Sequence, residues 1–407
     1  MTITIVEYLT HIYPWSELER FLTRHGDPLC KREFAIEGEF YKRYVVAKNA
    51  NDLKSQVISM PGVKSFHIGP VYSDVVTRRT TLSWPVRREL VFDVDLTDYD
   101  NLELSSPEGG VDVEACDKAW PICSIAIFVI QRILQHAFGY TQFVVVYSGR
   151  RGAHIYVCDD AAMNLTDEGR TAVASFLDHS LTKDKKRCTD QMRGMMKMYG
   201  LSDAIRFAFE EMVVKDMDLF GDLNQRLGFV DRLGLSEASL PILANMAEDV
   251  LDKQSGADAW EFLKSKVASL PQDWMRDRLD DVILALVWPR IDFNVTKSRG
   301  HLLKAPYIAH PKSGRVAVPI NVADFCNFSP AAVPSLRALD SETLKATFKF
   351  MRPCSIHNNQ TPTTDQSASL PEDVDMEDLM ESSPEQTAPA RKRGFVRKRS
   401  QLSQVFP

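Results

Sequence analysis

Residues 89–97 contain an alternation that fixes a β-strand and puts two carboxylates on it. The even-numbered residues from 90 to 96 are apolar, whereas Asp93 and Asp95 stand at odd-numbered positions. Successive side chains of a strand point to opposite faces, so both carboxylates lie on one face, about 7 Å apart at Cα. Like charges this close repel in a half-buried site unless a cation lies between them. The segment therefore predicts either a metal-binding pair or a solvated strand edge.

Length and composition bound the class of protein. The chain has 407 residues, more than one compact core usually holds, so we expect two lobes and a tail. Its 44% hydrophobic and 26% charged residues are ordinary for a soluble globular protein. We expect no membrane span and no signal peptide. Seven scattered cysteines favour a reducing compartment, and the net charge of −6 argues against a generic coat for nucleic acid.

The pattern along the chain predicts an α+β protein with a helical insertion. β-rich segments lie on both sides of a stretch rich in Met, Leu, Ala, Lys and Glu, which predicts helices over 160–285. After about residue 355 the chain lacks material for a core, and we expect a disordered tail. The other expected helices are 1–25, 121–138 and one within 330–350, and the expected strand-rich segments are 32–100, 141–160 and 288–321.

A second segment, 147–159, places cationic side chains at a turn between two strands. Two glycines bracket Arg150 and Arg151, and Ser148 and His154 flank them on either side. The guanidinium fork of arginine suits phosphate oxygens. The turn therefore predicts a phosphate-binding loop, although a polar hairpin tip has the same composition.

A third segment, 289–320, repeats the alternation of the first. Ile291, Phe293 and Val295 alternate with polar residues, which predicts a strand with Asp292 on its polar face. Lys304 lies among apolar residues, where its stem can be buried and its ammonium group can emerge in a pocket. His310 begins another turn. Each of these residues alone is as well explained by a structural role.

Taken together, the three segments predict a phosphoryl or nucleotidyl transfer site. Three aspartates supply the hard oxygen ligands that divalent cations prefer, and the cationic side chains could hold a triphosphate. Two ions about 4 Å apart can stabilise an in-line displacement. The sequence contains no P-loop and no paired CxxC zinc motif.

These segments resemble the small, catalytic subunit of eukaryotic-type DNA primases, of the archaeo-eukaryotic primase superfamily. The resemblance implies a primase lobe with RRM-like mixed or antiparallel sheets and flanking helices, interrupted by a helical lobe. The implied domains are 1–160 and 286–352 for the primase lobe, 161–285 for the insertion and 353–407 for the tail. The matching segments are REF, FYKRY, IGPVYS, ELVFDVDLTDYD, VYSGRRGAHIYVCD and PRIDFNVTK…HLLKAPY…HPKSGRVAVPI.

The resemblance also implies the chemistry and the partners. It implies DNA-templated synthesis of short RNA primers with two Mg²⁺ or Mn²⁺ ions on Asp93, Asp95 and Asp292. The implied partners are a large primase subunit, a replicative DNA polymerase complex, a single-stranded DNA template and ribonucleoside triphosphates. The implied nucleotide-binding residues are Glu33, Tyr41, Arg43, Ser148, Arg150, Arg151, His154, Lys304 and His310.

The chain departs from the family pattern in two places. Relatives carry a zinc-binding cysteine cluster after the TDYD string, but only Cys116 and Cys123 stand there. Two thiolates do not fill a tetrahedral site, so we expect no structural zinc. His67 stands where relatives often have an acidic residue.

Three other functions share some of these features. A primase-polymerase would extend existing ends with deoxynucleotides in damage bypass or repair, by the same chemistry. A non-enzymatic assembly subunit would not need the three aspartates, and a metal-dependent nuclease would not need a triphosphate pocket.

The tail carries two blocks of opposite charge. Residues 372–385 are acidic and residues 391–399 are basic. The basic block is typical of a nuclear import signal, which predicts a nuclear protein. A solvated charge run that contacts DNA is the other interpretation.

Overall fold

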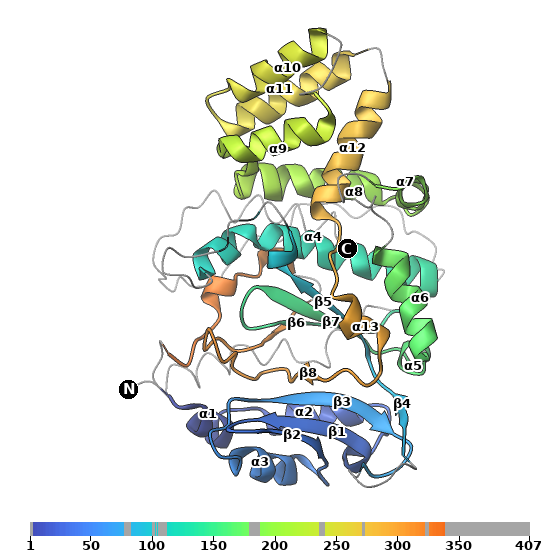
Figure 1. Ribbon diagram of the computed structural model, residues 1–407, viewed down its shortest axis with the longest axis vertical. Coiled ribbons are helices and arrows are strands. Elements are labelled where there is room, and N and C mark those ends of the chain that lie inside the picture. Colours follow the sequence, from blue (N-terminus) through green and yellow to red (C-terminus); the bar gives the residue numbers. More distant parts are fainter. Residues whose placement is uncertain are drawn as a thin grey trace, which may run out of the picture.

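The computed structural model describes residues 3–76, 83–99, 102, 104, 112–178, 188–235, 241–270, 273–321 and 325–337. Along its longest axis, one sheet with three helices is followed by a second sheet, the long helix α4 and a group of helices (Figure 1). Every strand pairing of the described residues is antiparallel. The predicted α+β class is confirmed. None of the described helices is both long and apolar enough to span a bilayer.

The first sheet has the strand order β2-β1-β3-β4, and the short strand β8 also pairs with β3. One face packs on three helices through side chains such as Phe34 and Phe66, which are fully buried. Its strands are β1 (Arg32–Glu37), β2 (Tyr41–Val45), β3 (Ser65–Tyr72), β4 (Pro85–Arg87) and β8 (Leu303–Lys304), and the helices are α1 (Ile5–His11), α2 (Trp15–Thr23) and α3 (Ala50–Ile58).

The prediction of one helix over 1–25 is wrong, because this segment forms two helices. Pro14 is the N-cap of α2. Proline has no backbone N–H and disfavours a helical conformation in the preceding residue, so the chain breaks there. The apolar spacing continues across the break and gave no sign of it.

The second sheet has the order β5-β7-β6-β9. Helix α4 (Val113–Phe138) runs along it (Figure 1). The predicted end of this helix at Gly139 is confirmed, since Gly139 has φ 70° as a left-handed C-cap. The helix begins earlier than predicted, at the Asp112 N-cap, because Pro121 inside it is tolerated. The strands are β5 (Leu90–Asp95), β6 (Phe143–Tyr147), β7 (Gly152–Val157) and β9 (Pro319–Ile320).

Between β7 and residue 288, the structure describes helices joined by short turns and contains no strand among the described residues. Its outer part has an aromatic core of its own, in which Phe209, Phe220 and Phe229 surround Trp260. Figure 1 shows this part beyond α4, whereas α6 lies beside α13. The domain boundaries stay predictions. The elements are α5 (Asp160–Met163), α6 (Asp167–Asp178), α7 (Asp190–Met198), α8 (Leu201–Ala208), a π-helix (Phe209–Asp216), a 3₁₀ turn (Leu219–Gly221), α9 (Leu223–Leu233), α10 (Pro241–Leu251), α11 (Gly256–Ser269) and α12 (Asp273–Val287).

The strand predicted around Asp292 is wrong. Ile291 makes one antiparallel bridge to Val94, and the chain then turns into helix α13 (Phe293–Lys297). Asp292 is the N-cap of this helix, and its Oδ1 accepts a hydrogen bond from the backbone N–H of Asn294 at 2.9 Å. An aspartate cap favours a helix start, and five alternating residues are too few to decide against it.

The C-terminal predictions lie mostly outside the described residues. In 330–337 the structure has a 3₁₀ turn (Pro330–Ala332) followed by irregular chain. The remainder of the helix predicted within 330–350 and the disordered tail predicted over 353–407 fall on residues that the structure does not describe.

Candidate functional site

The carboxylate face predicted on 90–97 is present on β5. Leu90, Phe92 and Val94 are fully buried, whereas the side chains of Asp93 and Asp95 keep 27% and 32% of their exposure. Both aspartates therefore point away from the core toward a partly open space.

The backbone brings the third aspartate to the same place. The N–H of Asp292 donates to the carbonyl oxygen of Asp93 at 3.0 Å, next to the bridge between Val94 and Ile291. Burial and the charges of Asp95 and Asp292 raise the pKa of Asp93 to about 7. The charges of Asp95 and Asp292 thus disfavour the ionised form of Asp93, and a cation among the three carboxylates would relieve this repulsion.

The donor set fits divalent cations that retain other ligands. Carboxylate oxygens are the hard donors that Mg²⁺ and Mn²⁺ prefer. In the described part of the chain, no three His, Cys, Asp or Glu side chains are gathered closely enough to enclose an ion. Mg²⁺ rarely needs such a cage, because it keeps waters and takes substrate phosphate oxygens as ligands. Asp93, Asp95 and Asp292 fit an open site of this kind.

The two cysteines after the TDYD string are in a poor position to bind zinc. Cys116 and Cys123 are both buried on α4. Burial raises the pKa of the Cys116 thiol to about 11 and raises that of Cys123 further. Zinc binds thiolates, so protonated thiols oppose it. The absence of a structural zinc stays a prediction.

The predicted turn of 148–151 connects β6 and β7 and packs against a second cationic turn. Gly149 has φ 85°, and a Cβ there would lie 2.8 Å from the carbonyl oxygen of Arg315. Ser313 Oγ donates to the Gly149 carbonyl oxygen at 2.6 Å. Glycine therefore permits both the left-handed backbone and this close approach. Ser148 begins the turn, where its N–H donates to the carbonyl oxygen of Gly152 at 2.9 Å.

One arginine of the turn reaches back to the carboxylates. Arg151 Nε donates to a carboxylate oxygen of Asp95 at 2.8 Å. The other, Arg150, has its pKa lowered by burial and by the charge of Arg151. The charge of Arg151 thus makes the charged form of Arg150 less stable. An anion bound beside the two guanidinium groups would remove this repulsion.

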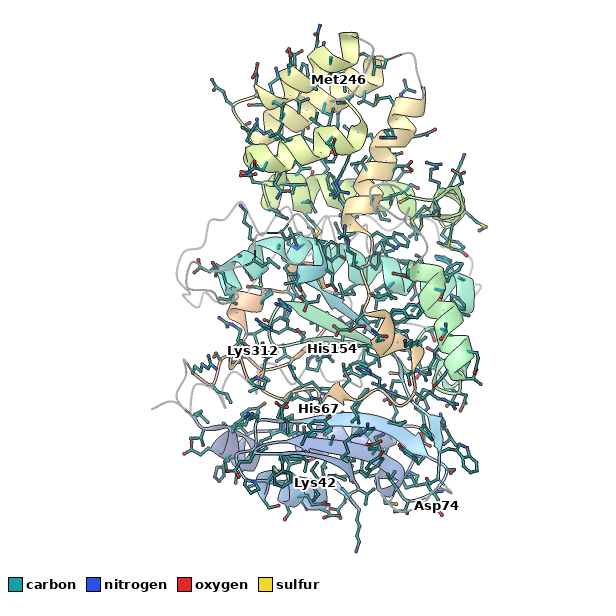
Figure 2. All side chains as sticks on the ribbon, in the orientation of Figure 1. Lys42, His67, Asp74, His154, Met246 and Lys312 are labelled. Atoms are coloured by element: carbon teal, nitrogen blue, oxygen red, sulfur yellow. The ribbon has the colours of Figure 1, made fainter. Side chains whose placement is uncertain are left out.

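His154, Lys304 and His310 continue the cationic region. Burial and the charge of Lys304 lower the pKa of His154 and of His310 to about 3 in each case, so both imidazoles are neutral at pH 7. Burial lowers the pKa of Lys304 to about 8. His154 Nε2 lies 3.8 Å from Asp93 Oδ1. Figure 2 shows His154 and Lys312 between the two sheets.

The first sheet forms the facing wall. Glu33 is fully buried and accepts hydrogen bonds at 2.9 Å from both Arg43 Nε and Tyr72 Oη. Tyr41 lies on the same strand as Arg43, and its ring is 5.7 Å from that of His67. His67 pairs with Lys304 in the register of β3 and β8, which joins this wall to the cationic region.

His67 lies on the side of the first sheet that faces the second sheet (Figure 2), and one of its ring nitrogens is unsatisfied. Its Nδ1 is buried without a hydrogen-bond partner. Burial, together with the charges of Lys304 and His301, lowers the pKa of His67, although Glu37 acts in the other direction. A neutral imidazole therefore stands at the position where the resemblance led us to expect an acidic residue.

The structure therefore places every predicted site residue on one of two facing walls. The sequence patterns did not single out Tyr72, nor did they single out Glu37, which accepts a hydrogen bond from Ser65 Oγ at 2.8 Å. Both act through partners far away in the chain, and periodicity does not encode such pairs. The individual roles of the site residues stay predictions.

Comparison with known proteins gives a consistent result. Residues 92–322 match the family model described as DNA primase small subunit. The DNA primase small subunit of Schizosaccharomyces pombe is 28% identical over 358 residues, which are 83% of this chain and 77% of that protein. The Drosophila melanogaster protein of the same name is 31% identical over 325 residues, 75% of this chain and 72% of that protein. PriS of Pyrococcus horikoshii is 24% identical over 273 residues, 64% of this chain and 72% of that protein.

Proposed function

The chain belongs to the DNA primase small subunit family, and from this premise we propose that its cleft makes RNA primers on a DNA template by two-metal nucleotidyl transfer. Membership makes the chain a DNA primase subunit, a nucleotidyltransferase that acts in DNA replication, and implies a primase large subunit as partner. The metal mechanism, the ribonucleotide substrate and the assembly with a polymerase are our proposals.

The three aspartates and the cationic residues would have different tasks in this reaction. Asp93, Asp95 and Asp292 would hold two Mg²⁺ or Mn²⁺ ions. Such ions, when bound, lower the pKa of the primer 3′-hydroxyl and stabilise charge on the α-phosphate and on the leaving pyrophosphate.

The cationic region would hold the β- and γ-phosphates. Arg150 and Arg151 offer guanidinium groups, and Lys304 offers a compact charge between the carboxylates and the first sheet. His154 and His310 are neutral, so they would contribute hydrogen bonds and not charge. Tyr41 and Arg43 would position the remainder of the nucleotide.

The observation that carries this proposal is the juxtaposition of the two regions. The backbone hydrogen bond from Asp292 to Asp93 brings the third aspartate next to the other two. The ion pair between Arg151 and Asp95 holds the cationic turn beside these three aspartates. A nuclease would need the first region without the second. A non-enzymatic assembly subunit would need neither.

The test is primer synthesis from nothing but template and nucleotides. We would incubate the purified full-length chain, alone and with its large subunit, with poly(dT) and either ATP or dATP, in Mg²⁺ or Mn²⁺. The proposal expects RNA oligomers without any added primer. If these reactions give no product and a parallel reaction with dATP on a primed template does, the chain is a primase-polymerase. If no combination gives product, the proposed function is wrong.

Two further proposals concern partners and place. We expect an obligate heterodimer with the large subunit, bound to a replicative DNA polymerase complex. We expect the template to be contacted mainly through its phosphate backbone, so that binding is sensitive to salt. We also expect a nuclear protein, because of the basic block 391–399 in the tail.

A further inference from the structure

Strand β2 carries an extra residue at Tyr44. In its pairing with β1, Phe34 is opposite Val45 and Ile36 is opposite Lys42. Two steps along β1 therefore face three steps along β2, which is a β-bulge. Tyr44 lies in this bulge with φ 58°, a left-handed conformation that side chains with a Cβ rarely adopt. A bulge of this kind re-aims a side chain, and here it re-aims an aromatic one.

The ring of Tyr44 is supported on one side and open to solvent. The guanidinium carbon of Arg43 lies 5.2 Å from the ring centroid. Arg43 is itself held by Glu33, which is fully buried and is also bonded to Tyr72. Tyr44 nevertheless keeps 39% of its exposure. A buried carboxylate thus fixes a cation beside an aromatic ring that is open to a partner.

The surroundings select the kind of partner. β2 is an edge strand of the first sheet, and no strand among the described residues pairs with its outer side. Lys42, on the same strand, is exposed and pairs with the buried Ile36, so it lies on the other face of the sheet (Figure 2). An exposed ring beside an arginine is an arrangement that stacks an unpaired base while the cation attracts the phosphate backbone. Stacking of this kind is tolerant of base identity, because every base has a π-face.

We propose that Tyr44, supported by Arg43 and Glu33, stacks on an unpaired base of the single-stranded template. The inference rests on the proposed function and adds a template contact to it. The incoming nucleotide is a less suitable source of the base. Tyr41, whose ring is next to that of His67, would already position that nucleotide, and Tyr44 lies three residues farther along β2, within the bulge.

The binding test compares variants that keep or remove the ring. We would measure the affinity of the full-length chain for fluorescent oligo(dT) without nucleotide. Tyr44→Asn removes the ring and accepts the left-handed backbone. It should weaken binding about tenfold, and Tyr44→Phe should stay within about twofold of the parent. Trp84→Ala is the matched control, since Trp84 is 62% exposed beside β4 at the opposite edge of the sheet. It should leave binding unchanged.

Two readouts separate stacking from general electrostatics. The slope of binding against salt should be unchanged in Tyr44→Asn, because a stacked ring neutralises no phosphate. An oligonucleotide with 5-iodouracil should crosslink to Tyr44 under long-wavelength light, as found by mass spectrometry. Parental affinity in Tyr44→Asn, with the crosslink elsewhere, would overturn the inference.

The remaining outcomes are also decisive. If Tyr44→Asn raises the KM for ATP and leaves template affinity unchanged, the base belongs to the incoming nucleotide, and the template assignment is wrong. Failure of the proposed function is seen separately, as a parental chain that makes no RNA. Failure of this inference alone is a parental chain that makes primers and a Tyr44→Asn variant that binds template as the parent does.

Discussion

Asp93 is the residue at which burial and like charge meet most directly. Its pKa is raised to about 7 by burial and by the charges of Asp95 and Asp292. In the folded state the Asp93 carboxylate is destabilised by burial and by its charged neighbours. Asp93→Ala removes this group, so we expect an unchanged or higher melting temperature. We expect primer synthesis to fall by roughly 10³-fold or more, because metal-based stabilisation of transition-state charge amounts to several kcal/mol.

The control for this prediction is Asp74→Ala. Asp74 lies just after β3 (Figure 2), and within the described residues its carboxylate accepts a hydrogen bond only from the neighbouring Val75 N–H. Synthesis and melting are measured for both variants. If Asp93→Ala keeps near-normal synthesis and the parental melting temperature, the assignment of Asp93 as a metal ligand is wrong.

Arg151 is shared between a carboxylate and the space beside it. Its side chain keeps 25% of its exposure while Nε is bonded to Asp95. We expect Arg151→Ala to raise the dissociation constant for ATP by about 10- to 150-fold, since a charged hydrogen bond contributes about 1.5–3 kcal/mol. Arg151→Lys should recover only part of this, because an ammonium lacks the fork geometry. Equal nucleotide affinity in all three proteins would mean that 148–151 is only a polar hairpin tip.

At the scale of elements, a buried ion pair joins the two sheets. Arg32 of β1 donates two hydrogen bonds, of 3.0 and 3.1 Å, to Glu89, which lies directly before β5. Burial alone would raise the pKa of Glu89, but the charges of Arg32 and Arg24 outweigh it and lower that pKa from 4.5 to about 2. The stabilisation from this pair is complete above pH 4.5 and is lost as the pH falls toward 2.

Glu89→Gln tests this linkage. At pH 7 we expect the free energy of unfolding to fall by about 3 kcal/mol, because the buried Arg32 loses its counter-charge. Between pH 4.5 and 2 the variant should lose less stability than the parent, since one titrating group is gone. Urea unfolding at pH 7, 4 and 3 measures both effects. Glu17→Gln is the control, because in the described part of the chain Glu17 forms its only ion pair with the exposed Arg20. If Glu17→Gln and Glu89→Gln behave alike, the pair does not join the sheets energetically.

Alternation of apolar residues predicted some elements and failed at others for physical reasons. It placed β5 correctly, because six residues pair with one neighbour along their length. It predicted a strand at Asp292 and was wrong, because the Asp292 side chain caps the five-residue helix α13. The two-residue strands β8 and β9 are set by their neighbours and not by their own sequence. Tyr44 could not be found at all, because a bulge depends on two strands at once.

At the scale of the whole molecule, the candidate site is complete before the C-terminal part of the chain begins. The last predicted site residue is His310, and the tail after about residue 355 lies outside the described structure. We therefore expect deletion of 355–407 to leave primer synthesis within about twofold of the parent. Large loss of synthesis with unchanged melting would mean that the tail belongs to the catalytic machinery.

The same deletion should abolish nuclear accumulation of a fluorescent fusion, because six basic residues lie within 391–399. Changing these six residues to alanine should have the same effect, whereas deletion of the acidic block 372–385 should not. If the basic block instead contacts DNA, the alanine variant stays nuclear and its template affinity becomes less sensitive to salt. An unchanged nuclear signal with unchanged salt dependence would contradict both interpretations for the isolated chain. Repeating the measurement in cells that lack the large subunit then shows whether that partner carries the chain into the nucleus.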